Sequence, residues 1–200
     1  MNAKFKKAAA TASTLALAVC LSIGGTYAYL TAETEEVTNT FTVGKVAITL
    51  DEADTDEYGE EKLISDSPAP RVTANDYKLI PGHSYLKDPT VHLAAGSEAC
   101  YVYVDVYNGL ANAISDIKEQ MRNKGWTNLD DGIWYQAVDA DTAAEGTDLV
   151  VFDNFTVAGD KVEDDLKAFD GKTITITAYA VQKDGFSDAA SAWEACFAGE

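Results

Sequence analysis

Few residues of this chain have the types and the spacing that enzymatic chemistry requires. The two histidines, His83 and His92, lack the H-E-x-x-H spacing by which a peptidase helix holds zinc. The sequence also contains no G-x-S-x-G turn for a serine nucleophile and no phosphate-binding glycine loop. We therefore predict no catalytic, cofactor-binding or metal-binding residues, and we interpret both histidines as structural.

The acidic run DEADTDEYGEE is the remaining candidate for ion binding. Asp54, Asp56 and Gly59 match positions 1, 3 and 6 of a calcium-binding loop. Position 5 would be Tyr58, and position 12, normally a bidentate glutamate, would be Ser65. Because this spacing fails, we favour a solvated acidic loop, with weak calcium binding as the alternative.

Residues 1–28 have the pattern of a secretory signal peptide. Three lysines precede an uncharged apolar stretch at 8–23, and Thr26 and Ala28 place small residues at −3 and −1 of a cut before Tyr29. The apolar stretch is shorter than the roughly 20 residues that a spanning helix needs. We expect cleavage after Ala28 and an exported protein; a retained anchor is the alternative.

The chain that remains after this cut is strongly acidic. The full sequence has a formal net charge of −18, and removal of the three signal-peptide lysines takes it to −21. Such a surface repels nucleic acids and anionic membranes, so we exclude both as partners of the mature chain. Contact with a membrane is expected only through the uncleaved signal peptide.

Two cysteines, Cys100 and Cys196, remain after removal of the signal peptide, since Cys20 lies in the apolar stretch. In an oxidising compartment they could pair as a disulfide. Each also falls on an apolar face, so two buried thiols are the equally weighted alternative.

Period-two alternation of apolar residues predicts a mostly β chain. Strands are predicted at 41–50, 90–93, 100–107, 132–138, 149–157 and 172–181. Helices are predicted after the cap Asn112, with Ile114, Ile117 and Met121 as the apolar stripe and Gly125 as the end, at 162–169, and after the cap Ser187. The acidic residues 139–147 are interpreted as a loop.

This order of elements predicts an all-β, mainly antiparallel sandwich over 41–200, with one inserted helix and one C-terminal helix. The preceding residues 29–40 are interpreted as a polar N-terminal arm. The apolar residues of the first strand change parity at Gly44, which predicts a bend. Inward-facing positions are Val102, Val104, Ile174 and Ile176, and the core is expected to contain Trp134, Tyr135, Tyr179 and Trp193.

The residues around the cut carry a resemblance to a known family. Gly24-Gly25-Thr26-Tyr27-Ala28-Tyr29 and Asn39-Thr40-Phe41-Thr42-Val43-Gly44 resemble the junction of exported Gram-positive proteins cut by a SipW-type signal peptidase, the TasA/camelysin family. The segments 81–93 and 176–193 are also similar to relatives in this family.

The resemblance implies a jelly-roll-like β-sandwich that is secreted to the cell surface or the biofilm matrix and assembles into fibres. In such an assembly the N-terminal arm of one subunit completes a sheet of the next. The implied partners are other copies of this chain and a SipW-type signal peptidase. The arm residues so implicated are Tyr29, Leu30, Val37, Phe41, Val43 and Gly44.

Camelysin relatives have been described as metallopeptidases, which gives a second hypothesis: an extracellular, metal-dependent peptidase. The scarcity of histidines and the lack of metal-ligand spacing favour the structural, self-associating protein over this alternative. A monomeric surface adhesin is a third and weaker option.

Overall fold

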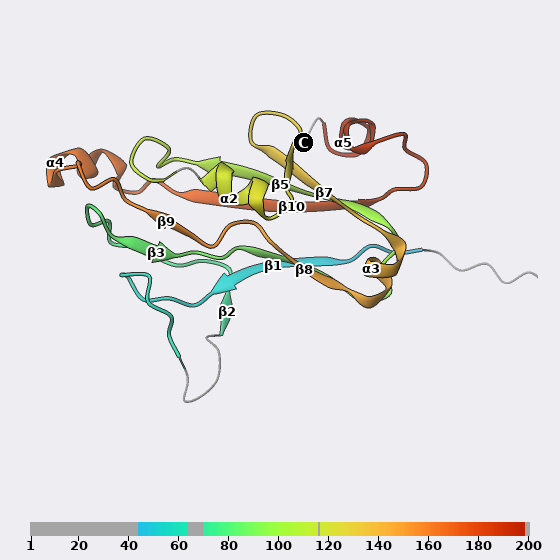
Figure 1. The fold of residues 1–200 in the computed structure, drawn as a ribbon, viewed down its shortest axis with the longest axis horizontal. Helices are drawn as coiled ribbons and strands as arrows, with labels where there is room; N and C mark the ends of the chain where they lie inside the picture. Colours follow the sequence, from blue (N-terminus) through green and yellow to red (C-terminus); the bar gives the residue numbers. More distant parts are fainter. Residues whose placement is uncertain (1–43, 64–69, 116, 199–200) are drawn as a thin grey trace, which may run out of the picture. The chain divides into compact units, whose positions relative to one another are not determined.

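The computed structural model describes residues 44–63, 70–115 and 117–198 (Figure 1). The strands are β1 (Ile48–Ala53), β2 (Arg71–Val72), β3 (Ser84–Leu86), β4 (Thr90–Leu93), β5 (Cys100–Asn108), β6 (Thr127–Asn128), β7 (Ile133–Val138), β8 (Thr147–Val150), β9 (Asn154–Thr156) and β10 (Ile174–Gln182). The helices are α2 (Ile117–Asn123), α3 (Ala140–Glu145), α4 (Glu163–Leu166), the 3-10 turn η1 (Lys167–Phe169) and α5 (Ala189–Cys196).

The strands form two four-stranded sheets and a separate two-stranded ladder. The first sheet has the order β2-β1-β4-β8, the second has the order β10-β5-β7-β6, and β3 pairs with β9. All of these pairings are antiparallel. In Figure 1 the layer of β5, β7 and β10 lies over the layer of β1 and β8. The predicted all-β, mainly antiparallel sandwich is confirmed.

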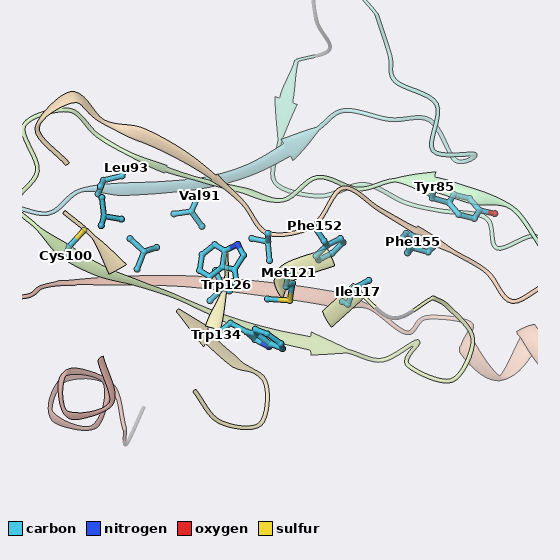
Figure 2. Packing of buried hydrophobic residues seen from close by; sticks show 14 of the residues in the cluster. Tyr85, Val91, Leu93, Cys100, Ile117, Met121, Trp126, Trp134, Phe152 and Phe155 are labelled. Carbon is cyan, nitrogen blue, oxygen red and sulfur yellow. The ribbon is translucent and has the colours of Figure 1, made fainter. Parts of the chain in front are cut away.

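The main core lies between the two layers (Figure 2). Val91 of β4 is fully buried in this cluster together with Val102 and Val104 of β5, as the alternation predicted for β5. Trp134 of β7 joins them. Full burial of such aliphatic side chains stabilises the fold by roughly 1.5–3 kcal/mol each, which makes β4 and β5 the centre of the sandwich.

A second, aromatic cluster covers the opposite face of the β5 sheet. Tyr103 is fully buried there, and its hydroxyl donates to the carbonyl oxygen of Ala189 at 2.7 Å. The Trp193 ring of α5 lies 5.1 Å from the Tyr103 ring. Tyr135 and Tyr179 pack against this cluster, while Trp134 lies in the main core.

The predicted cap of the last helix was wrong by one residue. The N-cap of α5 is Asp188, whose carboxylate accepts a hydrogen bond from the backbone nitrogen of Ser191 at 2.8 Å. Ser187 precedes it, and its hydroxyl contacts Asp188 instead. An aspartate satisfies the exposed N–H groups of a first turn as well as a serine does, so the sequence left the choice open.

The first strand begins later than predicted and continues further. β1 spans Ile48–Ala53 rather than 41–50, and residues 41–43 lie outside the described residues. The strand continues through Asp51 and Glu52 because both carboxylates have cationic partners on neighbouring elements. An alternation of apolar and polar residues cannot reveal such paired charges.

The apolar run 149–157 forms two strands, not one. β8 pairs with β4, whereas β9 pairs with β3, so the chain changes partner between them. Val151 and Phe152 lie at this change and are fully buried, which explains the unbroken apolar pattern. The predicted loop 139–147 contains the helix α3, which begins at an Asp139 cap that accepts from the Thr142 nitrogen at 2.8 Å.

The inserted helix α2 begins at Ile117, later than the predicted cap Asn112. The segment before it is tied to β9 and the turn that follows. The Ser115 nitrogen donates to the Thr156 oxygen at 2.8 Å, and Ile114 forms a bridge with Val157. These bonds tie residues 114 and 115 to neighbouring strand segments, and residues 109–113 form turns, so the helix begins only after them.

Candidate functional site: an open sheet edge

β10 is the longest edge strand among the described residues. It pairs with β5 along nine residues, from Ile174 opposite Asn108 to Gln182 opposite Cys100. Within the described part of the chain its other side has no strand partner. An unpaired edge presents a row of N–H and C=O groups to which another strand can add.

The remaining edges of the two sheets are much shorter. β2 and β6 have two residues each, and β8 has four. Short edge strands and edge charges are the usual protection against unwanted pairing. β10, with the sequence ITITAYAVQ, contains neither a charge nor a proline. Its length and composition therefore favour the addition of a strand.

A groove of about 1120 Å³ lies beside this edge. We call it the edge groove, lined by Leu50, Glu52, Val72–Leu79, Lys87, Phe155, Leu166, Phe169 and Lys172–Ile176, among others. These residues come from β1, from β2 and the segment that follows it, from β9, from the α4–η1 turn and from the first half of β10. The groove thus runs between the first sheet and the open strand of the second.

The wall that β10 contributes is apolar and incompletely covered. Ile174 and Ile176 pack against the main core, as predicted, but both remain only partly buried. Val102 and Val104, on the neighbouring strand β5, are fully buried. The core is therefore complete at β5 and incomplete at β10. An extended segment with alternating apolar side chains could bond to β10 and complete it.

A polar cluster around the buried pair Glu52 and Lys87 forms the opposite wall of the edge groove. The Lys87 ammonium lies 2.5 Å from a Glu52 carboxylate oxygen, and the two residues are 8% and 4% exposed. Asn75 donates through Nδ2 to the other Glu52 oxygen at 2.9 Å. Burial raises the pKa of the adjoining Tyr77 hydroxyl to about 12, so that this group stays protonated. Sequence reasoning missed the cluster, because contacts between residues so far apart leave no local spacing signal.

His92 belongs to a charged network on the outer face of the first sheet. Its Nδ1 lies 2.6 Å from Asp148 and its Nε2 lies 2.9 Å from Asp51. Arg71 bridges Asp51, at 2.7 Å, and Asp88, at 2.6 Å. Burial alone would lower the pKa of His92, but the hydrogen bonds to the two aspartates raise it above its usual value. Both ring nitrogens are thus engaged in structural contacts.

The other histidine and the acidic loop are likewise engaged within the fold. His83 Nε2 contacts the Tyr58 carbonyl oxygen at 2.8 Å. Asp54 pairs with Lys62 at 2.6 Å, and the Asp56 carboxylate accepts two backbone N–H bonds of its own turn. Among the residues that the structure describes, no group of three or more His, Cys, Asp or Glu side chains could hold a metal ion.

The two cysteines are free thiols in the structure, so the disulfide considered above is not formed. Cys100 is buried in the main core between the sheets. Cys196 is exposed at the end of α5, which packs on the opposite face of the β5 sheet. The alternative of two buried thiols does not hold for Cys196, because Trp193 and Phe197 pack toward the sheet in its place.

The cleavage and arm residues lie outside the described residues, apart from Gly44. These are Thr26, Ala28, Tyr29, Leu30, Val37, Phe41 and Val43. Gly44 lies before β1, and a side chain there would meet Glu98 Cγ at 2.8 Å. None of the described helices is long and apolar enough to cross a membrane.

Comparison with known proteins gives one match. Residues 3–57 match a family model described as camelysin metallo-endopeptidase. No curated protein and no solved structure matches the chain. The matched residues contain all but the first two residues of the predicted signal peptide, together with the arm and β1, so they include both junction motifs that carry the resemblance. The N-terminal segment of the chain is thus similar to the camelysin family, in agreement with the resemblance that the junction motifs carry.

Proposed function

We propose that this chain is an exported structural protein of the cell surface or biofilm matrix, and that it assembles into fibres by strand addition. In this proposal the N-terminal arm of one subunit adds to β10 of the next. The observation that carries the proposal is the open, charge-free edge of β10 beside the edge groove, whose β10 wall is apolar. The family match supports export and the presence of an arm.

The arm has the chemistry that the edge groove requires. Phe41 and Val43 are two positions apart, so in an extended segment both side chains point to the same face. That face would cover Ile174 and Ile176, while the arm's backbone bonds to the edge of β10. Each backbone bond contributes a net of roughly 0.5–1.5 kcal/mol, and the covered apolar area adds to it.

Charge opposes assembly. The mature chain carries a formal charge of −21 once the three signal-peptide lysines are removed from the total of −18. Repulsion between such subunits is screened by salt, with a Debye length of about 10 Å at 0.1 M. Assembly is therefore expected to be slow at neutral pH and low salt, and faster in acid or at high salt.

Truncation of the arm tests the mechanism. A chain that begins at Gly44 should stay folded and monomeric, whereas a chain that begins at Tyr29 should form fibres under the same salt and pH. Sedimentation and electron microscopy distinguish the two outcomes. Fibres formed equally well by the truncated chain would show that the arm is not the connector.

A charge placed in the edge groove tests the acceptor. Ile176→Lys puts an ammonium on the groove wall and should abolish fibres. Ala137→Lys is the matched control, since Ala137 is exposed, lies on β7 away from the open edge and does not line the groove. Circular dichroism checks that both variants fold. Equal assembly of the two variants would contradict the choice of β10.

The family-model description gives a second candidate function, a metal-dependent endopeptidase. It predicts stoichiometric zinc in the purified mature chain, and cleavage of casein that a chelator abolishes. The same preparation used for electron microscopy serves this assay, so that the two functions can be compared directly.

A further inference from the structure

The buried Glu52 and Lys87 and the partly buried Asn75 form an arrangement on the wall of the edge groove that is suited to covalent chemistry. Glu52 lies between an amine and an amide, and each of its carboxylate oxygens contacts one of them. Oε2 is 2.5 Å from Lys87 Nζ, and Oε1 is 2.9 Å from Asn75 Nδ2. The carboxylate could therefore take a proton from one nitrogen and deliver a proton to the other.

The amide of Asn75 is fixed in one orientation. Its Nδ2 also donates to the Ala53 carbonyl oxygen at 2.8 Å, and its Oδ1 accepts from the Thr55 backbone nitrogen at 2.9 Å. The bond to Oδ1 places a donor where negative charge would develop if a nucleophile attacked the amide carbon. The Thr55 hydroxyl is buried without a partner among the described residues, which leaves a second donor on the same residue unused.

We propose that Lys87 and Asn75 form an intramolecular isopeptide bond, with Glu52 as the proton-transfer catalyst. Lys87 is the nucleophile, Asn75 is the electrophile, and ammonia is the leaving group. The reaction needs no oxidant, cofactor or external enzyme. It concerns a single subunit, so it is independent of the fibre assembly proposed above.

The reaction proceeds by proton transfer and addition. The Glu52 carboxylate accepts a proton from the Lys87 ammonium through Oε2, which leaves a neutral amine. The amine nitrogen attacks Asn75 Cγ, and the charge on Oδ1 is stabilised by the Thr55 N–H. The Cγ–Nδ2 bond then breaks as Glu52 returns this proton to Nδ2, which leaves as ammonia. The surplus proton on the new amide nitrogen passes through the Glu52 carboxylate to the ammonia. One lysine ammonium and one primary amide thus become one secondary amide and one ammonium ion.

The surroundings of the Glu52–Lys87 pair are largely aromatic. Lys87 Nζ lies 6.0 Å from the centre of the Tyr77 ring, and Tyr77 packs edge-on against Tyr85 and Phe155, at 5.7 and 5.4 Å. An ion pair in an apolar environment pays a large desolvation cost, which proton transfer within the pair removes. Formation of the amide removes the buried charge of the lysine permanently.

Mass spectrometry of the mature protein tests the proposal. The intact mass should be lower than the sequence mass by one ammonia, and a protease digest should contain one branched peptide that joins Lys87 to Asn75. An unshifted mass, with a Lys87 amine that reacts with an acylating reagent after denaturation, would overturn the proposal. Loss of one water instead would indicate a bond between Lys87 and Glu52, and would overturn it as well.

Glu52→Gln tests the catalyst. This variant keeps the shape of the side chain but removes the proton acceptor, and its mass should equal that of its own unmodified sequence. Glu61→Gln is the control, because Glu61 is exposed, and it should show the full loss of ammonia. A Glu52→Gln protein that still loses ammonia would remove Glu52 from the mechanism. If this variant does not fold, the intact mass of the unaltered protein still decides whether the bond exists.

Discussion

The sheet of β10, β5, β7 and β6 is covered by α5 on its outer face, whereas its β10 edge has no strand partner among the described residues. On the outer face, α5 covers Tyr103 completely and packs Trp193 and Phe197 against Tyr179. At the edge, Ile174 and Ile176 of the same strand remain partly exposed beside the edge groove. β10 therefore has one apolar face that α5 covers, at Tyr179, and another that remains partly exposed, at Ile174 and Ile176. The difference indicates that the chain can cover its own aromatic face, whereas the edge is available to another segment.

The largest effect is expected at the closed face. Tyr103→Ala should lower the free energy of unfolding by about 3–5 kcal/mol, because a fully buried ring is lost and a cavity is left beneath α5. Chemical denaturation followed by tryptophan fluorescence measures this change. Tyr103→Phe is the control, since it removes only the hydrogen bond to Ala189 and should cost roughly 0.5–1.5 kcal/mol. Equal losses in the two variants would show that α5 does not depend on ring packing.

A smaller effect is expected at the open edge. Ile176→Ala should cost about 2 kcal/mol in the monomer, the lower end for such a substitution, because the side chain is only partly buried. In fibres the cost should be larger, since the arm would then cover this position. Melting of the monomeric truncation and of the fibres, with and without the substitution, gives the comparison. An equal cost in both states would argue against coverage of Ile176 in the fibre.

The smallest effect is expected at the outer face of the first sheet, which has charges in place of aromatic rings. The pKa of folded His92 is raised above its usual value of about 6.5. Its ion pairs with Asp51 and Asp148 therefore stabilise the fold fully below that pH, and this contribution is lost as the pH rises through the folded pKa. The gain is about 1 kcal/mol or less.

Denaturation at several pH values measures the contribution of His92. The unaltered protein should lose stability as the pH rises through the folded pKa of His92, and His92→Gln should lack that part of the slope. A slope that is unchanged in His92→Gln would assign the titration to another group.

The sequence predicted those parts of the fold in which side-chain period and burial agree. The predicted end of β5 was within one residue of the observed end. Cys100, Val102 and Val104 occupy alternate positions and face the core, and the strand is central in its sheet. The predicted bounds of β1 were too early in the sequence, since the polar half of this strand is held in the sheet by Arg71 and Lys87, which come from later in the chain.

The candidate site was less accessible to sequence reasoning. The alternation in β10 placed Ile174 and Ile176 on the inner face, but it could not show that the strand has one partner among the described residues. The Glu52–Asn75–Lys87 cluster depends on contacts across 23 and 35 positions. Only the folded chain brings these side chains together.

The antiparallel ladder between β5 and β10 has a mechanical consequence. In a fibre built by strand addition, tension would enter each subunit along the axis of β10 and pass to β5 through nine paired residues. The hydrogen bonds of an antiparallel pair lie perpendicular to the strands, so a pull along the strand axis loads them in shear and together. A ladder loaded in this way must break many bonds at once, whereas one that is peeled from its end breaks them in sequence. The length of β10 would therefore set the tensile strength of the subunit.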